Sequence, residues 1–400
     1  MVHLNSIVCT HVEWKNGFLY GGLLLSPLIF FHMLKEPKEK FIADVYCVSD
    51  SIKAKLQLIL ENRPYRPPFY SKFDWHGQLQ TVAQFILRAS TRVIQSLIPF
   101  STTGYVKFER ELVPLSDGGL IALDWATINS LTDAHWDGSS VVVINHGLGG
   151  GSNSDYIVHL AEKLILARYR VVVVIARGCC GLNITTPSFV MRKTSDMREA
   201  LLKVTSRLQH PGKIFMVGFS LGGALSLKYL CEEGARCTIT AAVCISPPWR
   251  MDKRTGVHGT WSKGIMLLLK AYIYRHRKLL ASTKVSIRDV LSTSSIDDLE
   301  GIFSEAYGYS SLAEYYADNS PINFALHDIH TPTLTVSSLD DPVCCGHVGP
   351  SSLCGEKIGP GLCVVKTSRG GHCSFPNGLL PSRATWTDQV IVDWFDLHND

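Results

Sequence analysis

One serine lies in a sequence pattern that is typical of a catalytic nucleophile. Residues 218–222 have the sequence Gly-Phe-Ser-Leu-Gly, with Ser220 at the centre. The apolar run Lys-Ile-Phe-Met-Val precedes this pattern, and a helical pattern follows it. A serine on a tight strand-to-helix turn projects its hydroxyl above a sheet, and the flanking glycines let helix and strand approach closely. We therefore predict Ser220 as a nucleophile. The alternative is a glycine-rich turn with an ordinary capping serine.

A serine hydroxyl is a poor nucleophile at neutral pH, so it needs a base that an acid orients. Downstream of such a turn, the acid and then the histidine follow in chain order. Asp341 follows the apolar run Thr-Leu-Thr-Val-Ser-Ser, and His372 follows Leu-Cys-Val-Val-Lys-Thr-Ser with two glycines before it. We predict Ser220, Asp341 and His372 as a triad. Asp340 is the alternative acid, and we expect it to have a supporting or capping role.

A glycine-rich run could hold the negative charge that such a reaction develops. Residues 146–151, His-Gly-Leu-Gly-Gly-Gly, follow the apolar run Val-Val-Val-Ile-Asn. Backbone N–H groups in a run of this kind suit an oxyanion hole, together with the N–H after the nucleophile. We predict Leu148 and Leu221 as these donors. A phosphate-binding loop is the alternative, but the run lacks the Lys-[Ser/Thr] of a P-loop. No histidine or cysteine spacing predicts a metal, and we expect no cofactor.

Short apolar runs that alternate with helical patterns must position these residues. Such an alternation predicts an α/β fold with a mostly parallel central sheet and helices on both of its faces. The alternation stops at residues 249–321, where helical segments predict a cap insertion over the sheet. We expect three parts: an N-terminal segment (1–40), a helical or loop extension (41–104) and a catalytic domain (105–400). The strands expected in that domain are 105–113, 120–127, 141–145, 170–176, 213–219, 238–246, 331–338 and 361–367.

The N-terminal segment contains a candidate membrane anchor. Residues 18–34 are seventeen residues without a charge, followed by Lys35, Lys38 and Lys40. As a helix they span about 25 Å, which is short of the ~30 Å hydrocarbon core. We predict a single-pass signal anchor or an interfacial helix; the alternative is an element that caps the soluble domain. The lysines favour a cytosolic catalytic domain only weakly, so the orientation stays open.

Composition restricts the class of protein further. Charged residues make up 18% of the chain, hydrophobic residues 46%, and the net charge is +4. This excludes a disordered chain and predicts no nucleic-acid partner. The twelve cysteines form no metal or disulfide signature, so we predict mostly reduced thiols. Because their number is even, a lumenal form with disulfides is the alternative. Residues 264–280 combine an apolar half with a basic half, which predicts either a helix on an anionic membrane or an ordinary packed cap helix.

Several motifs in a fixed order add a family resemblance. The chain contains HGLGGGS, an RGC loop followed by NITTP, GFSLGG, ISPPW, DDP and RGGH, and the cap contains IDDLEGIFSEAYGYSSLAEYYADNSP. From about Tyr65 to its end it resembles the α/β-hydrolase superfamily, and more narrowly abhydrolase domain-containing proteins 1 and 3 with their bacterial and yeast esterase relatives. Two departures are Ala176, where asparagine is usual, and Cys344-Cys345 after DDP, which affects the expected pocket.

The resemblance implies the α/β-hydrolase fold, the same triad, a membrane anchor near the N-terminus, and esterase or phospholipase activity on lipid acyl chains. The expected protein is a serine carboxylic-ester hydrolase, a phospholipase or medium-chain lipid esterase that forms an acyl-enzyme on Ser220. One alternative is an acyltransferase in which an alcohol replaces water. The other is a catalytically silent, membrane-bound binder of lipid or protein. The sequence specifies neither the acyl-chain length and head group nor the oligomeric state.

Overall fold

The computed structural model describes residues 41–68, 77–78, 80–82, 106–128, 140–186, 193–208, 212–251, 259–280, 285–344, 358–378 and 385–399. The chain divides into two compact units, Met1–Glu39 and Lys40–Asp400, and every described residue belongs to the second unit. The predicted anchor at 18–34 lies outside the described residues. Among the described helices, none has the length and apolar character that crossing a bilayer requires.

Nine strands of the described chain form one sheet in the order β1-β9-β8-β7-β6-β4-β5-β3-β2. The strands from β5 through β4, β6, β7 and β8 to β9 are parallel, whereas β1, β2 and β3 are antiparallel to their neighbours. This confirms the predicted mostly parallel sheet. The strands are β1 (Ile42–Cys47), β2 (Val106–Pro114), β3 (Leu120–Ile128), β4 (Val141–Asn145), β5 (Arg170–Ile175), β6 (Ile214–Phe219), β7 (Ile239–Ile245), β8 (Thr333–Ser338) and β9 (Leu362–Thr367).

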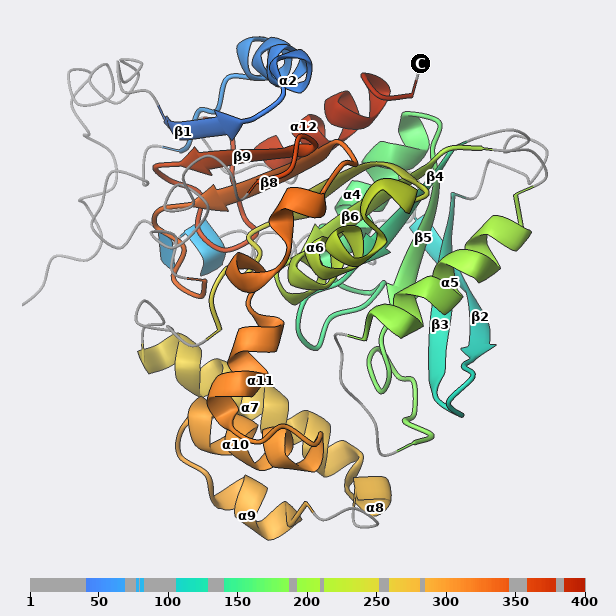
Figure 1. The fold of residues 1–400 in the computed structure, drawn as a ribbon, viewed down its shortest axis with the longest axis vertical. Coiled ribbons are helices and arrows are strands. Elements are labelled where there is room, and N and C mark those ends of the chain that lie inside the picture. The colour runs from blue at the N-terminus through green and yellow to red at the C-terminus, as the bar shows by residue number, and fades with distance from the viewer. Residues whose placement is uncertain are drawn as a thin grey trace, which may run out of the picture. The chain divides into compact units, whose positions relative to one another are not determined.

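Helices cover both faces of the sheet, as the alternating pattern predicts (Figure 1). In β4 every residue is buried: Val142 and Ile144 belong to one hydrophobic core, and Val141 and Val143 to the other. This division follows from the two-residue period of a strand, and burial on both sides explains its continuous apolar run. The first core is covered by α2 (Asp50–Asn62), α4 (Asp155–Leu166) and α12 (Trp386–Asp396), and the second by α5 (Thr194–Ser206) and α6 (Leu221–Glu233).

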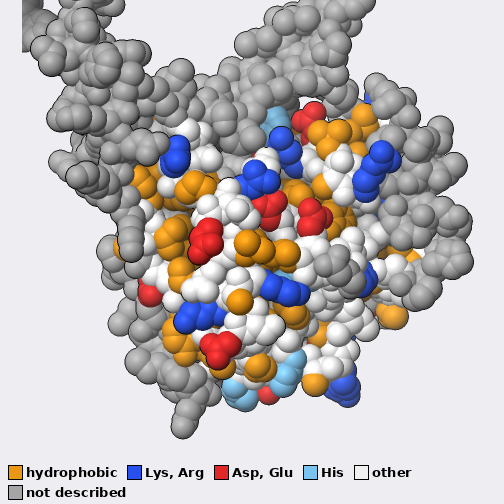
Figure 2. Space-filling view, turned by 90° about the horizontal axis from the view of Figure 1, so that it is seen from above, with side chains coloured by type: hydrophobic (Ala, Val, Ile, Leu, Met, Phe, Trp, Pro, Cys, Tyr) orange, Lys and Arg blue, Asp and Glu red, His pale blue; other side chains and the backbone are white. Residues whose placement is uncertain are grey.

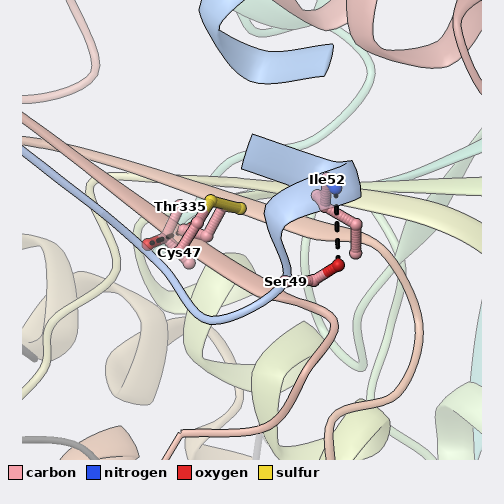
Figure 3. The surroundings of a disulfide bond; sticks show 5 residues. Cys47, Ser49, Ile52 and Thr335 are labelled. Carbon is pink, nitrogen blue, oxygen red and sulfur yellow. Dashed lines mark hydrogen bonds between the residues drawn. A yellow bond between two sulfur atoms is a disulfide. The ribbon is translucent and has the colours of Figure 1, made fainter. Parts of the chain in front are cut away.

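The region expected to be a helical or loop extension also supplies a strand. β1 pairs antiparallel with β9, and a disulfide joins Cys47 to Cys363 directly across this pair (Figure 3). Ser49 then caps α2 by accepting a hydrogen bond from the Ile52 N–H. Seven other cysteines of the described chain form no disulfide with one another. The disulfide was not predicted, because its cysteines are 316 residues apart and their pairing depends on the sheet register.

Five helices form the described part of the predicted cap, with a small core of their own (Figure 1, yellow to orange). Apolar side chains such as Met266, Ile273, Leu299 and Phe303 pack together there. Because this cluster is separate from the two cores of the sheet, the cap packs as a distinct layer. Its helices are α7 (Gly259–Arg275), α8 (Arg277–Leu280), α9 (Ile287–Ser292), α10 (Ile296–Ala306) and α11 (Leu312–Asn319). The 3₁₀ turns are η3 (Gly234–Arg236), η4 (Pro321–Asn323) and η5 (Leu326–Asp328).

Candidate active site

Ser220 occupies the sharp turn between β6 and α6. Its backbone has φ 51° and ψ −118°, a conformation that residues other than glycine rarely adopt. The turn is held by the Ser220 N–H, which donates to the Ile245 carbonyl at 2.8 Å. Non-glycine residues in such conformations cost about 1–3 kcal/mol and are concentrated at functional sites. The turn also places the serine at the N-terminus of α6, where the helix dipole stabilises negative charge.

The two glycines of the Gly-Phe-Ser-Leu-Gly pattern are required by close packing. A Cβ atom on Gly218 would lie 2.5 Å from the Gly222 carbonyl oxygen and 2.5 Å from the Ser226 hydroxyl. A Cβ on Gly222 would lie 2.3 Å from the Asn145 carbonyl oxygen. These distances are far below van der Waals contact, so a methyl group at either position would push strand and helix apart. The glycines therefore fix the position of the turn.

The structure brings the three predicted triad residues together. Ser220 follows β6, Asp341 follows β8 and His372 follows β9, so all three lie at the carboxyl ends of parallel strands. The His372 Nε2 atom is 3.0 Å from the Ser220 Oγ, and its Nδ1 atom is 2.9 Å from the Asp341 Oδ2. With a proton on Nδ1, the imidazole donates to the carboxylate and accepts from the hydroxyl. This arrangement can remove a proton from Ser220.

The two adjacent aspartates make different contacts. The Oδ1 atom of Asp341 accepts hydrogen bonds at 2.8 Å from the backbone N–H groups of Val343 and Cys344, which leaves Oδ2 facing His372. Asp340 instead accepts from the Gly371 N–H at 2.8 Å and from the Ser338 hydroxyl. Asp341 thus hydrogen-bonds with the imidazole ring, whereas these two contacts of Asp340 are with Ser338 and with the backbone of the histidine loop. This geometry supports the predicted preference for Asp341.

Two further hydroxyl groups hold the histidine loop. The backbone N–H of His372 donates to the Thr81 Oγ1 at 2.9 Å, and the N–H of Cys373 donates to the Ser246 Oγ at 3.1 Å. Thr81 belongs to the predicted N-terminal extension, so that extension takes part in positioning the loop. Sequence reasoning missed both residues. No local pattern marks them, because each acts across more than a hundred residues of sequence.

The surroundings of His372 set its proton affinity. Burial is the largest single influence and lowers the pKa of His372, but Asp341, Cys373 and Cys344 together raise it by more. The resulting pKa lies well above the usual value for histidine. A protonated imidazole cannot accept the serine proton, so the site can act as a base only above this pKa.

The same residues form a donor set of the kind that metals bind. One atom each of Asp341, Cys344 and His372 lie within 4.8 Å of one another. However, both carboxylate oxygens of Asp341 already accept N–H hydrogen bonds, one of them from the His372 ring. The carboxylate and the imidazole therefore satisfy each other directly, and a cation would have to displace that hydrogen bond.

The glycine-rich run 146–151 lies beside Ser220. A Cβ on Gly147 would lie 3.4 Å from the Ser220 Cβ, so this backbone passes at contact distance. The Gly147 N–H donates to the Tyr156 hydroxyl at 2.9 Å, and burial raises the pKa of Tyr156 to about 12, which keeps it neutral. The predicted donors Leu148 and Leu221 directly follow Gly147 and Ser220 in sequence. Their role as an oxyanion hole stays a prediction.

The His146 side chain connects the glycine-rich run to Ala176. Sequence reasoning did not predict this role. Its Nε2 atom accepts from the Ala176 N–H at 3.2 Å, so its Nδ1 atom carries the proton and donates to the Gly147 carbonyl at 2.7 Å. Burial lowers the pKa of His146, which favours this neutral form. The sequence feature that could have indicated this role is the histidine at the start of the glycine-rich run.

A buried carboxylate holds the other end of the run. Asp124 is 1% exposed and accepts from the Ser152 hydroxyl at 2.5 Å. Arg110 pairs with both of its oxygens, at 2.7 Å each. The run is therefore attached to β3 through Ser152 and Asp124. The sequence feature that could have indicated this attachment is Asp124 itself, since it is a lone carboxylate within an apolar strand.

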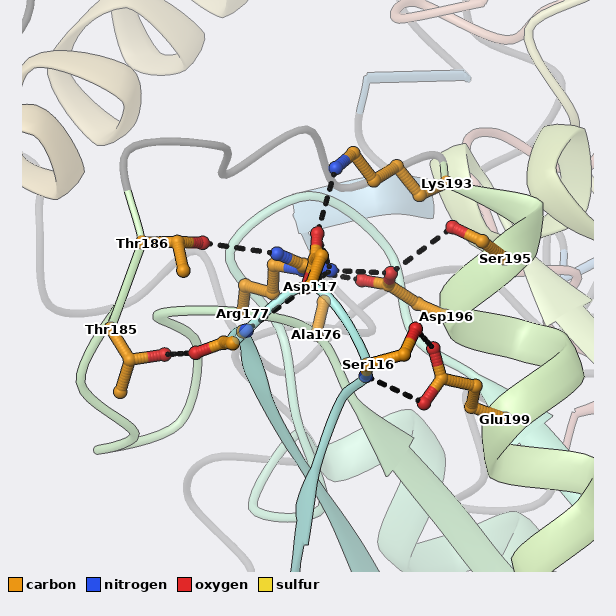
Figure 4. A network of polar contacts seen from close by, with 12 residues as sticks. Ser116, Asp117, Ala176, Arg177, Thr185, Thr186, Lys193, Ser195, Asp196 and Glu199 are labelled. Carbon is orange, nitrogen blue, oxygen red and sulfur yellow. Dashed lines mark hydrogen bonds and ion pairs between the residues drawn. The ribbon is translucent and has the colours of Figure 1, made fainter.

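Arg177 holds the neighbouring loop that follows β5 (Figure 4). Its guanidinium group donates to both oxygens of Asp196 at 2.6 and 2.7 Å, and to both oxygens of Asp117 at 2.9 Å. The carbonyl oxygen of Arg177 accepts from the Tyr272 hydroxyl of the cap at 2.9 Å. These contacts anchor the loop and connect the sheet to α7.

A cavity of about 230 Å³ lies between this loop, the glycine-rich run and the cap. Leu148 and Gly149 of the glycine-rich run line it together with residues of α7. Most of its lining is apolar, and Arg275 contributes a positive charge. Leu148, a predicted oxyanion donor, is among its lining residues, so the cavity adjoins the predicted site. Its lining residues are Leu148, Gly149, Gly178, Cys179, Cys180, Leu268, Leu269, Ala271, Tyr272 and Arg275.

Comparison with known proteins identifies similar chains. A family model described as "alpha/beta hydrolase fold" matches residues 140–263. The phospholipase ABHD3 of Homo sapiens is 30% identical over 329 residues, which cover 79% of this chain and 75% of that protein. The medium-chain fatty acid ethyl ester synthase/esterase 2 of Saccharomyces cerevisiae is 28% identical, covering 79% and 86%. The putative esterase YheT of Escherichia coli is 28% identical, covering 75% and 89%.

Proposed function

Because this chain belongs to the α/β-hydrolase family, we propose that it is a serine hydrolase that cleaves carboxylic esters of lipids through an acyl-enzyme on Ser220. The observation that carries this proposal is the hydrogen-bonded series from the Ser220 Oγ through His372 to Asp341, at 3.0 and 2.9 Å. A base in contact with a hydroxyl on a strained turn is the arrangement that serine-dependent acyl transfer requires.

The proposed reaction has two steps. In the first, the Ser220 oxygen attacks the ester carbonyl while the His372 Nε2 takes its proton, and the N–H groups of Leu148 and Leu221 hold the oxyanion. The imidazolium returns the proton to the leaving alcohol as the ester bond breaks. In the second step, His372 takes a proton from water as the water oxygen attacks the acyl-enzyme carbonyl. The bond between the acyl group and the Ser220 oxygen then breaks, the imidazolium returns the proton to that oxygen, and the carboxylic acid leaves. Asp341 stabilises the imidazolium in both steps and stays ionised.

The cavity and the similar proteins support a lipid substrate. The lining of the cavity is mostly apolar, as an acyl chain requires, because binding there removes the apolar surface of the chain from water. Relatives carry the names phospholipase ABHD3 and medium-chain fatty acid ethyl ester synthase/esterase 2. We therefore propose a glycerophospholipid or a medium-chain ester as the substrate.

A second function differs only in the acyl acceptor. The name of the yeast relative includes both "synthase" and "esterase", and an acyl-enzyme can transfer its acyl group to an alcohol as well as to water. Incubation with a p-nitrophenyl ester in the presence of ethanol distinguishes the two functions. A hydrolase releases mainly fatty acid, whereas an acyltransferase releases mainly the ethyl ester.

The proposal is tested by hydrolysis assays on four proteins: wild type, Ser220→Ala, His372→Ala and the control His327→Ala. The substrates are p-nitrophenyl esters from acetate to palmitate and phosphatidylcholines of the same chain lengths. Loss of either triad residue should lower kcat by about 10⁴-fold or more. His327 has a side chain that is 61% exposed, so its variant should match wild type. Wild-type protein without turnover on any ester would instead support a silent lipid or protein binder.

A further inference from the structure

The cap helix α7 exposes apolar side chains to solvent. Leu267 is 70% exposed, Leu268 56% and Tyr274 52%, and Ala271 between them is also exposed. Leu267, Ala271 and Tyr274 are spaced four and three residues apart, so they lie on one face of the helix. Isolated exposed leucines are normal on protein surfaces, but a continuous apolar face marks an interaction site.

The other face of α7 is already occupied. Met266 and Ile273 are buried in the core of the cap. A surface helix with one apolar face in the core normally has polar residues on its outer face. In α7 the outer face is apolar too, which the packing of the cap does not explain.

Positive charges surround this apolar face. Residues 259–280 contain five lysines and arginines and no aspartate or glutamate. Lys263, Arg275 and Lys278 are exposed, whereas Lys270 donates to the Leu291 and Thr293 carbonyls within the cap. The face drawn in Figure 2 differs, since positive and negative side chains alternate there among scattered hydrophobic ones. An apolar face with basic residues beside it is the pattern of a helix that lies in the surface of an anionic membrane.

The same helix also forms a wall of the cavity. Leu268, Ala271 and Arg275 are exposed to solvent and line the cavity that adjoins Leu148. A membrane in contact with the outer face of α7 would therefore lie beside the entrance to that cavity.

We propose that the exposed face of α7 docks on an anionic lipid bilayer. Leu267, Leu268 and Tyr274 enter the boundary between head groups and acyl chains, and Lys263 and Arg275 lie at the level of the lipid phosphates. Docking brings lipid to the cavity without passage through water. The delivery of substrate rests on the proposed function, whereas the docking itself does not.

The test measures hydrogen–deuterium exchange of the full chain carrying Ser220→Ala, so that no lipid is hydrolysed. Vesicles of phosphatidylcholine with one third phosphatidylserine are compared with phosphatidylcholine alone. Anionic vesicles should protect peptides that cover α7 and leave those that cover α5 unchanged. Exchange at α7 reports local docking even if residues 18–34 also bind the vesicle.

A matched pair of variants identifies the side chains involved. Leu267→Glu should abolish the protection of α7, whereas Leu202→Glu on α5, where the leucine is 71% exposed, should leave it intact. With Ser220 restored, Leu267→Glu should lower the rate on vesicle phospholipid at least about tenfold, the effect of losing one buried leucine, and leave the rate on a soluble p-nitrophenyl ester unchanged.

Equal exchange at α7 with and without anionic vesicles would overturn the proposal, as would protection that persists in Leu267→Glu. Protection that rises with protein concentration in the absence of vesicles would also overturn it, because the face would then bind a second copy of the chain. Failure of the proposed function gives a different result: no ester is cleaved by wild type, while α7 is still protected by vesicles.

Discussion

His372 lies between the Ser220 hydroxyl and one oxygen of Asp341, which is itself almost fully buried. The other oxygen of Asp341 is fixed by two backbone N–H groups, so the carboxylate cannot rotate without losing them. At the scale of the residue, the account therefore depends on which aspartate orients the imidazole.

Replacing Asp341 by Asn should lower kcat by about 10⁴-fold, because the amide N–H₂ group favours the wrong tautomer of His372. The matched control is Asp340→Asn, which removes a charge one residue away and leaves the Asp341–His372 contact in place. We expect this control to lose far less activity. Steady-state kinetics on a soluble ester measures both, and an equal loss in the two variants would contradict the assignment.

The pH dependence tests the same contact. The pKa of His372 lies well above the usual histidine value, and Asp341 is the first of the groups that raise it against the effect of burial. The ratio kcat/KM should therefore fall as the pH decreases through that raised pKa, where the imidazole becomes protonated. In Asp341→Asn the raising charge is absent, so the acidic limb of the residual activity should move to lower pH. A limb that stays in place would show that another group titrates.

The triad residues could be predicted from sequence because each directly follows an apolar run, which is how a parallel sheet presents side chains at one edge. The supporting residues could not be predicted in the same way. Thr81 and Ser246 bond the backbone of the His372 loop from distant parts of the chain. Their function depends on tertiary contacts, and a single threonine or serine carries no local signal of such a contact.

At the scale of the element, the turn between β6 and α6 depends on its glycines. Gly218→Ala should lower the free energy of unfolding by about 3 kcal/mol or prevent folding, because its Cβ would lie 2.5 Å from the Gly222 oxygen. Gly301→Ala in α10 is the control: its Cβ meets no atom within 4 Å, and alanine favours a helix by about 1 kcal/mol. Urea unfolding measures both, and similar stability of the two variants would contradict the packing argument.

The loop after β5 gives a second test of an element. Arg177→Ala should lower the free energy of unfolding by about 3 kcal/mol, because it leaves Asp196 and the half-exposed Asp117 without their buried partner. The control Arg198→Ala also loses two carboxylate contacts, to Glu232 and Glu233, but its side chain is 39% exposed. We expect a change of about 0–1 kcal/mol there, measured by the same urea titration.

Eight of the nine described strands follow from the apolar runs, and the exception shows the limit of that signal. β1 has the sequence Ile-Ala-Asp-Val-Tyr-Cys. It is a short edge strand with mostly half-buried residues, so it lacks the continuous apolar run of the central strands. Its place beside β9 is set by pairing with a strand more than three hundred residues away, which local sequence does not encode.

At the scale of the whole molecule, the sheet supplies the catalytic residues and the cap supplies a wall of the cavity. Arg177 and Gly178 connect the two layers through the Tyr272 hydroxyl and the His276 ring. The alternation of apolar runs with helical patterns, and its interruption at 249–321, predict both layers, and the family membership confirms the fold. The sequence of α7 allowed two interpretations, a helix on an anionic membrane or a packed cap helix, because exposure depends on how the cap packs. The structure shows one face of α7 packed in the cap and the other exposed.

The most direct test of the central claim is fluorophosphonate labelling of the full chain, followed by mass spectrometry of the labelled peptide. The account predicts one adduct on Ser220 in wild type, none in Ser220→Ala, and strongly slowed labelling in His372→Ala, because the hydroxyl then has no base. An adduct of equal intensity in Ser220→Ala, located on another residue, would show that Ser220 is not the nucleophile and would contradict the account.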